Sequence, residues 1–169
     1  MMLSSQTIKE LIDEKNKPLI EGFVDLDKQL QQSGFDFTLE KVYLIEGEGV
    51  LDFDNSNRKI PSNKEMEFDK SDFIKLEKGT YKIRFNETVH LPSNIAAMAK
   101  PRSSLLRMGA TIYSALWDPG FEGKSESMLV VENKKGIKLK KNAKLMQFVF
   151  FQLDKKSDRL YNGVYKNIK

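Results

Sequence analysis

The sequence predicts an all-β fold, a barrel or a sandwich, in a single domain over residues 1–169. Short apolar runs recur along the chain, turn residues separate them at short intervals, and stretches with helical spacing are few. A chain of this length can bury a sizeable core without disulfides or structural metals. We therefore expect many strands and one or two short helices.

The N-terminal half opens with a predicted amphipathic helix over residues 4–15, where apolar residues recur at helical spacing. A strand is expected at 35–39, because apolar residues alternate there and place Asp36 on the opposite face. Two strands are predicted within 42–53, on either side of a glycine-containing turn. A polar, loop-rich stretch follows over 54–72, with a short strand anchored by Met66 and Phe68.

The C-terminal half continues as strands separated by turns. A bulge is expected around 124–127, and the tail from about 157 to 169 is expected to be mobile. Strands are predicted at 73–76, 79–85, 95–99, 110–117, 128–131, 137–139 and 143–153.

Composition excludes several classes of protein. The chain has no cysteine and a single histidine, so we expect neither disulfides nor a zinc site. We expect no membrane-spanning segment and no secretory leader, and hence a cytoplasmic protein. The lysines over 134–144 fit a solvated loop better than a nucleic-acid surface, because no aromatic residues lie between them.

Residues 100–123 combine two chemical features. Ser103 and Ser104 precede a short apolar run that Gly109 closes, which predicts a helix of one or two turns with a serine N-cap. Free N–H groups, hydroxyls and the Arg102 guanidinium at such a start form an anion site. Asp118-Pro119-Gly120 then predicts a type II turn at the tip of a β-hairpin.

Four stretches of the chain together resemble the motifs of the dUTPase and dCTP deaminase superfamily, most of all the short archaeal-type dUTPases. The resemblance implies a distorted, jelly-roll-like β-barrel. The stretches are Ser-Gly-Phe-Asp-Phe at 33–37, Pro-Arg-Ser-Ser-Leu-Leu-Arg at 101–107, Trp-Asp-Pro-Gly-Phe-Glu-Gly at 117–123 and Asn-Ala-Lys-Leu-Met-Gln-Phe-Val-Phe at 142–150.

What the resemblance implies is Mg²⁺-dependent hydrolysis of dUTP to dUMP and pyrophosphate. Asp118 would orient the attacking water, although an Asp in this position also caps its own turn. Asp36 would hold Mg²⁺ through waters, the alternative being an edge-strand carboxylate that faces water. Phe121 would stack on the deoxyribose, and backbone groups from Tyr113 to Trp117, including Ala115, would pair with uracil.

The remaining assignments concern phosphates, the tail and the assembly. The resemblance implies a homotrimer whose active sites lie between subunits, so that the second motif of one subunit faces the third motif of another. Phosphate contacts are expected from Arg102, Ser103, Ser104, Arg107 and Gln147, and tail contacts from Tyr161, Tyr165 and Lys166.

Two other functions stay open at this point: dCTP deamination, alone or with dUTP hydrolysis, and nucleotide binding without catalysis. Deaminases of the superfamily use a glutamate on the strand after the third motif. The family spacing places Val130 or Met128 there, while Glu126 and Glu132 are offset from it. We therefore expect a dUTPase without deaminase activity.

Overall fold

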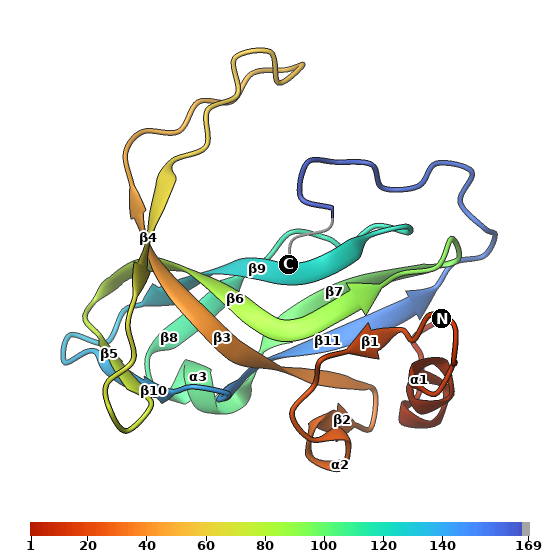
Figure 1. Ribbon diagram of the computed structural model, residues 1–169, viewed down its shortest axis with the longest axis horizontal. Coiled ribbons are helices and arrows are strands. Elements are labelled where there is room, and N and C mark those ends of the chain that lie inside the picture. The colour runs from red at the N-terminus through yellow and green to blue at the C-terminus, as the bar shows by residue number, and fades with distance from the viewer. Residues whose placement is uncertain (167–169) are drawn as a thin grey trace.

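The computed structural model describes residues 1–166 and confirms the all-β prediction (Figure 1). Three short helices accompany the strands: α1 (Ser5–Ile12), α2 (Leu26–Gln29) and α3 (Ser103–Arg107). The strands are β1 (Ile20–Glu21), β2 (Leu30–Gln31), β3 (Gly34–Glu46), β4 (Ser62–Met66), β5 (Phe73–Leu76), β6 (Gly79–His90), β7 (Ile95–Pro101), β8 (Ala110–Tyr113), β9 (Glu122–Val131), β10 (Ile137–Lys140) and β11 (Lys144–Gln152).

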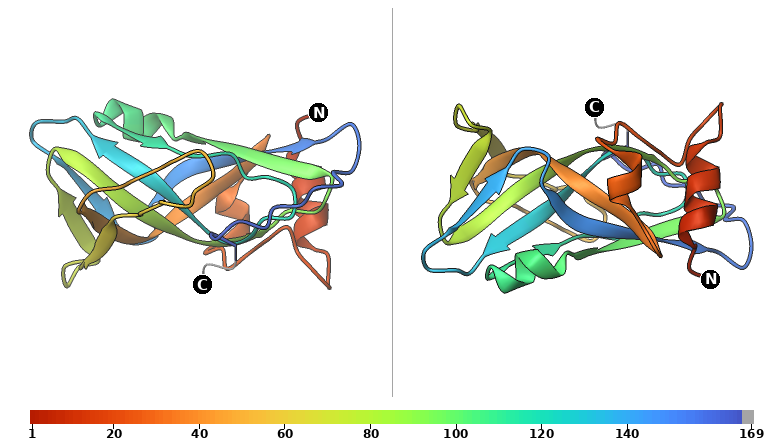
Figure 2. Two further views of the ribbon diagram at one scale, coloured as in Figure 1. Left: turned by 90° about the horizontal axis from the view of Figure 1, so that it is seen from above. Right: turned by 90° about the horizontal axis from the view of Figure 1, so that it is seen from below.

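The strands form one long, antiparallel sheet in the order β7-β11-β3-β6-β9-β8, with β1 on β6 and with β2 and β4 on β3. The sheet curls into a distorted barrel, which Figure 2 shows from above and below. β7 and β8 are the two ends of this order, and an isolated bridge joins Ala97 of β7 to Trp117 in the segment after β8. β5 and β10 make a separate two-stranded sheet.

The core of the barrel is aromatic. Phe35, Phe37, Phe85, Phe148 and Phe150 are completely buried. The rings of Phe37 and Phe148 stack with centroids 3.7 Å apart, and Phe85 meets both of them edge-on. The predicted alternation on β3 therefore holds for its apolar face, whose residues fill the centre of the barrel.

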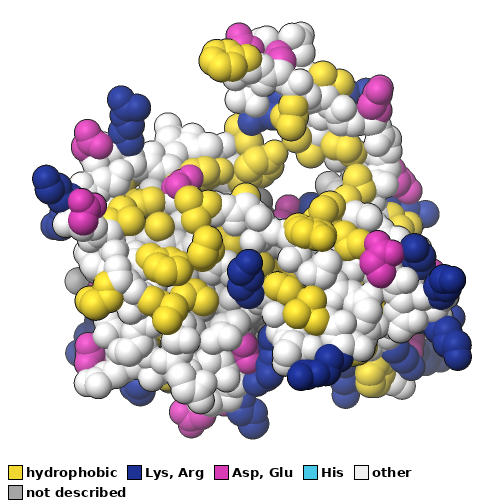
Figure 3. Space-filling model, turned by 180° about the vertical axis from the view of Figure 1, so that it is seen from behind, with side chains coloured by type: hydrophobic (Ala, Val, Ile, Leu, Met, Phe, Trp, Pro, Cys, Tyr) yellow, Lys and Arg dark blue, Asp and Glu magenta, His cyan; other side chains and the backbone are white. Residues whose placement is uncertain are grey.

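Of the two strands predicted within 42–53, the first forms as the C-terminal part of β3, and the second is reduced to a single bridge between Val50 and Lys59. β3 runs without interruption to Glu46, and residues 47–61 form an arm that stands away from the body, as Figures 1 and 3 show. Gly47 adopts a positive φ of 99° where the strand ends. Leu51 is largely exposed on the arm and Phe53 is fully exposed. Their side chains therefore pack against no other part of the protein, and no hydrophobic contact stabilises a sheet there.

The predicted hairpin forms only at its base. β8 and β9 pair from Ala110–Val131 as far as Tyr113–Met128, and the chain then leaves β9 to reach β7 through Trp117. The turn that follows has the predicted type II features. Gly120 has a φ of 84°, and the Phe121 N–H donates to the Asp118 carbonyl at 3.1 Å.

The predicted bulge lies at the expected level of the sheet but on the other strand. The register of β6 on β9 steps from Arg84–Glu126 to Thr88–Lys124, so the extra residues belong to β6. One of them, Glu87, turns into the interior and accepts hydrogen bonds from Thr38 of β3. These buried bonds hold the extra residues of β6 in place.

Replacing Phe148 by Ala is expected to lower the free energy of unfolding by about 3–5 kcal/mol, because the substitution opens a cavity among several aromatic rings. Urea denaturation measures the change. Phe53→Ala, at a fully exposed ring on the arm, is the control and should change stability by no more than about 0.5 kcal/mol. A loss below about 1 kcal/mol for Phe148→Ala would contradict this description of the core.

Candidate functional site

Three of the four motifs meet at the end of β7 that leads into α3. The Asp36 carboxylate of β3 is only 2% exposed there. Its Oδ2 atom lies 2.7 Å from Arg102 Nη1 and 3.3 Å from Lys144 Nζ. Burial raises the pKa of Asp36 above its ordinary value, although Arg102 and Lys144 oppose the shift. We call this group, with Ser103, Ser104 and Gln147, the anion cluster.

The two serines of the anion cluster face outward. Ser103 and Ser104 occupy the first turn of α3 and are exposed. The predicted serine N-cap is wrong, because Arg102 is the N-cap and makes no side-chain capping bond, its guanidinium being directed at Asp36. Gln147 is half-buried on β11, in register between Asp36 of β3 and Lys100 of β7.

A buried polar network fixes β3 next to the anion cluster. Glu87 accepts hydrogen bonds from the Thr38 N–H at 3.0 Å, the Thr38 hydroxyl at 2.6 Å and Gln29 Nε2 at 2.7 Å. Gln29 Nε2 also donates to the Asp36 carbonyl at 2.8 Å. Burial raises the pKa of Glu87, and the three donors oppose the shift. The backbone that carries Asp36 is thus tied to the β6 bulge.

The anion cluster does not fit a metal site built by the protein. Mg²⁺ prefers several oxygen ligands and keeps part of its water shell, whereas the Asp36 carboxylate faces two cations and is nearly closed to solvent. Within residues 1–166, no group of three or more His, Asp or Glu side chains could hold a metal ion. The environment of Asp36 instead suits a residue that orients Arg102.

The third motif forms a second feature, the hairpin pocket, on the outer side of β9. This cavity has a volume of about 250 Å³ and lies beneath the chain that leaves β8. Ala115, Leu116 and the aromatic side chains of Trp117 and Phe121 form its walls, and both aromatic residues are largely buried. Asp118, which directly follows Trp117, is exposed to solvent. An aromatic cavity with a free carboxylate beside it suits a flat organic ligand and a water molecule.

The tail lies against the same turn. The Tyr161 N–H donates to the Pro119 carbonyl at 2.7 Å, and the Tyr161 ring lies 5.5 Å from the Phe121 ring. Tyr165 also lines the pocket, and Lys166 Nζ donates to the Tyr161 carbonyl at 3.5 Å. The last part of the predicted mobile tail, residues 167–169, lies outside the described residues.

Within one chain the anion cluster and the hairpin pocket lie at opposite ends of β7. Trp117 and Ala97 exchange two backbone hydrogen bonds of 2.9 Å, while Arg102 is five residues further along, which is roughly 16 Å in an extended strand. Gly120 bonds to Leu91, beyond the start of β7, so the turn points away from α3. Asp118 and Ser103 therefore cannot act on one small ligand within the same chain.

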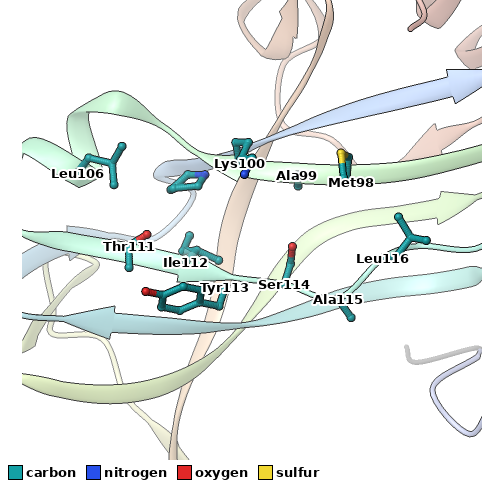
Figure 4. A pocket seen from close by; sticks show the side chains of 11 residues that line it. Met98, Ala99, Lys100, Leu106, Thr111, Ile112, Tyr113, Ser114, Ala115 and Leu116 are labelled. Carbon is teal, nitrogen blue, oxygen red and sulfur yellow. The ribbon is translucent and has the colours of Figure 1, made fainter. Parts of the chain in front are cut away.

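A groove of about 490 Å³ along the open barrel edge connects the two regions. In Figure 4, Met98 and Lys100 of β7 lie on one side, the segment around Tyr113 lies on the other, and Leu106 and Leu116 lie toward its two ends. The side chains of Met98, Leu106, Tyr113 and Leu116 are all substantially exposed. Exposed apolar side chains this close together are typical of a surface that contacts another molecule.

Sequence reasoning missed four residues that build these features: Lys124 and Glu126 of the hairpin pocket, and Glu87 and Gln29 of the network below Asp36. Alternation along β9 could have placed Lys124 and Glu126 on the face of the pocket, because inward residues on this strand are small or apolar. Glu87 gave no usable signal, since its burial depends on the irregular pairing of β6.

Comparison with known proteins agrees with this geometry. A family model described as dCTP deaminase-like matches residues 2–153. A probable deoxyuridine 5'-triphosphate nucleotidohydrolase of Methanosarcina mazei is 51% identical over 98% of this chain and 96% of its own length. A deoxyuridine 5'-triphosphate nucleotidohydrolase of Methanocaldococcus jannaschii is 44% identical over 83% of this chain and 88% of its own.

Among solved structures, a 2'-deoxycytidine 5'-triphosphate deaminase of Agrobacterium tumefaciens superposes with a TM-score of 0.62 at 22% identity. The match covers 88% of this chain and 47% of that protein, and it shows the shared fold. Of the helices in residues 1–166, none is long and apolar enough to cross a membrane. From the matched domain and the relatives that align over nearly its full length, the chain belongs to the dUTPase and dCTP deaminase superfamily.

Proposed function

We propose that the protein hydrolyses dUTP to dUMP and pyrophosphate. The observation that carries this proposal is the hairpin pocket, in which the lining residue Trp117 is followed directly in the chain by the exposed Asp118. The names of the archaeal relatives support the same substrate. The nucleoside would occupy the pocket, with the triphosphate extending past Asp118.

In this reaction Asp118 accepts a hydrogen bond from a water and aims its oxygen at the α-phosphorus. The new P–O bond forms as the bond from the α-phosphorus to the α,β-bridging oxygen breaks, and pyrophosphate leaves. General-base assistance of this kind contributes about 10²–10⁴ in rate. Phe121 packs on the deoxyribose, leaving no space for a 2'-hydroxyl. Backbone groups of Ser114, Ala115 and Leu116, which lie outside the strand pairing, are available to uracil.

The phosphates would be held by the anion cluster of a second copy. Ser103 and Ser104 offer exposed hydroxyls, Arg107 is exposed at the end of α3, and Gln147 adds an amide. Asp36 orients Arg102 rather than contacting phosphate. The proposed Mg²⁺ would be carried in by the triphosphate itself, since Mg²⁺ commonly binds substrate phosphates and retains waters.

The proposed assembly is the homotrimer, because one chain holds two halves that belong to different sites. The exposed apolar side chains of the edge groove offer a surface for a second copy to cover. Tyr161, Tyr165 and Lys166 would then cover the nucleotide. The cytoplasmic location stays a prediction.

The first test incubates the protein with dUTP and dCTP separately, with Mg²⁺, and measures pyrophosphate and ammonia. We expect pyrophosphate from dUTP and no ammonia from dCTP. Neither position that the family spacing allows for the deaminase glutamate, Met128 or Val130, carries an acid. Glu132 lies beyond the end of β9, where it pairs with Lys78 at 3.0 Å. Ammonia release at a comparable rate would favour a deaminase, and nucleotide binding without either product would favour a regulatory protein.

Asp118→Asn is expected to lower kcat by about 10²–10⁴-fold and to change KM only slightly, because the amide keeps the shape of the turn but loses the negative charge. Steady-state kinetics with dUTP measures both constants. Asp154→Asn, at an exposed residue after β11, is the control. Near-normal turnover of Asp118→Asn would mean that this carboxylate only caps its turn.

Mixing the Asp118→Asn and Ser103→Ala variants is expected to restore part of the activity that each has lost. Mixed assemblies contain some sites in which an intact Asp118 faces an intact Ser103. The measurement is pyrophosphate release after the subunits have exchanged. Light scattering that finds a monomer at a concentration where the wild-type protein is active would refute the shared site.

A further inference from the structure

Two charged side chains lie in an otherwise apolar hairpin pocket. Lys124 and Glu126 alternate along β9 with buried residues, so both point outward into the cavity beside Trp117 and Phe121. Neither belongs to the four motifs. Their side chains are only 21% and 23% exposed, so both are largely shielded from open solvent.

Both charges are paired from beneath the pocket. Lys82 Nζ donates to the two carboxylate oxygens of Glu126, each at 2.9 Å. Lys124 Nζ donates to Glu40, which also accepts a hydrogen bond of 2.6 Å from Arg84. Burial alone would raise the pKa of Glu40, but the bonds from Lys124 and Arg84 hold it below its usual range.

The pairing leaves spare hydrogen-bonding capacity in fixed positions. A carboxylate offers about four acceptor sites, of which Lys82 uses two, and an ammonium has three donors, of which Glu40 uses one. The lining of the pocket thus includes an acceptor that cannot donate and a donor that cannot accept, two positions apart on β9. Its charges are nearly balanced, so it does not repel a nucleotide as an isolated carboxylate would.

We propose that Glu126 and Lys124 are specificity-determining residues that distinguish uracil from cytosine in the hairpin pocket. Uracil has an N3–H donor, from which a carboxylate can accept, and an O4 acceptor, to which an ammonium can donate. Cytosine reverses this pattern, because its N3 accepts and its 4-amino group donates. With cytosine in the same orientation, the carboxylate would face the N3 acceptor and the ammonium would face the 4-amino donor. A site built for hydrogen bonding strongly rejects a ligand that leaves its polar groups unpaired.

This inference rests on the proposed function, because it assumes that the pocket receives the base. It adds side-chain recognition to the backbone contacts expected from the segment after β8. It also gives a role to the Lys82–Glu126 pair, which joins β6 to β9 directly behind the pocket.

The test compares kcat/KM for dUTP and dCTP in the wild-type protein and in Glu126→Gln and Lys124→Gln, following pyrophosphate. An amide can both donate and accept, so each variant is expected to lower the ratio of the two values at least tenfold, mainly through KM. Glu65→Gln is the matched control, because Glu65 also pairs with a lysine, Lys41, at 2.8 Å but lies outside the pocket. Circular dichroism checks that the variants fold.

If the wild-type protein hydrolyses dUTP and both variants keep its selectivity, the inference is overturned and the proposed function stands. If the wild-type protein releases no pyrophosphate from dUTP, the proposed function fails. The inference is then decided by calorimetric titration with dUMP and dCMP: a preference for dUMP that Glu126→Gln abolishes supports it, and equal affinities overturn it.

Discussion

The contact between Trp117 and β7 is the constraint on which the rest of the site depends. Its backbone exchanges two hydrogen bonds with Ala97, and its ring lies 4.3 Å from Phe148 in the aromatic core. These contacts draw the chain away from β9 after Tyr113, which opens the hairpin pocket. They also tie the segment after β8 to β7 at one point, so the remaining edge between β7 and β8 stays open as a groove. The anchoring of Trp117 thus produces both the hairpin pocket and the groove along the barrel edge.

The fold was largely predictable because its signals are local. Alternation on β3 predicted which phenylalanines fill the core, and Asp118-Pro119-Gly120 predicted a turn with a positive φ at glycine. The arm after Glu46 was not predictable, because its apolar residues resemble strand residues in sequence but meet no partner surface. The bulge was predicted on β9 but lies on β6, because the buried Glu87 carboxylate of β6 is held by hydrogen bonds from Thr38.

The grouping of the candidate residues in space was only partly predictable. The motifs singled out Arg102, Ser103, Asp118 and Gln147, and the resemblance already implied that Ser103 and Asp118 of one chain serve different sites, but local signals did not show that β7 separates them. The role of Asp36 also depended on packing. Its alternation in the sequence fits an exposed ligand equally well, whereas the structure surrounds it with Arg102, Lys144 and a strand fixed by Glu87.

The separation of the two clusters along β7 has a consequence for how activity depends on abundance. In the proposed shared-site assembly, a chain that holds halves of two different sites contributes nothing alone, so turnover per chain falls on dilution once the subunits begin to separate. Activity then rises faster than in proportion to the amount of protein. A change in the rate of synthesis or degradation of the protein would therefore change the rate of nucleotide hydrolysis more than in proportion, without any separate effector site.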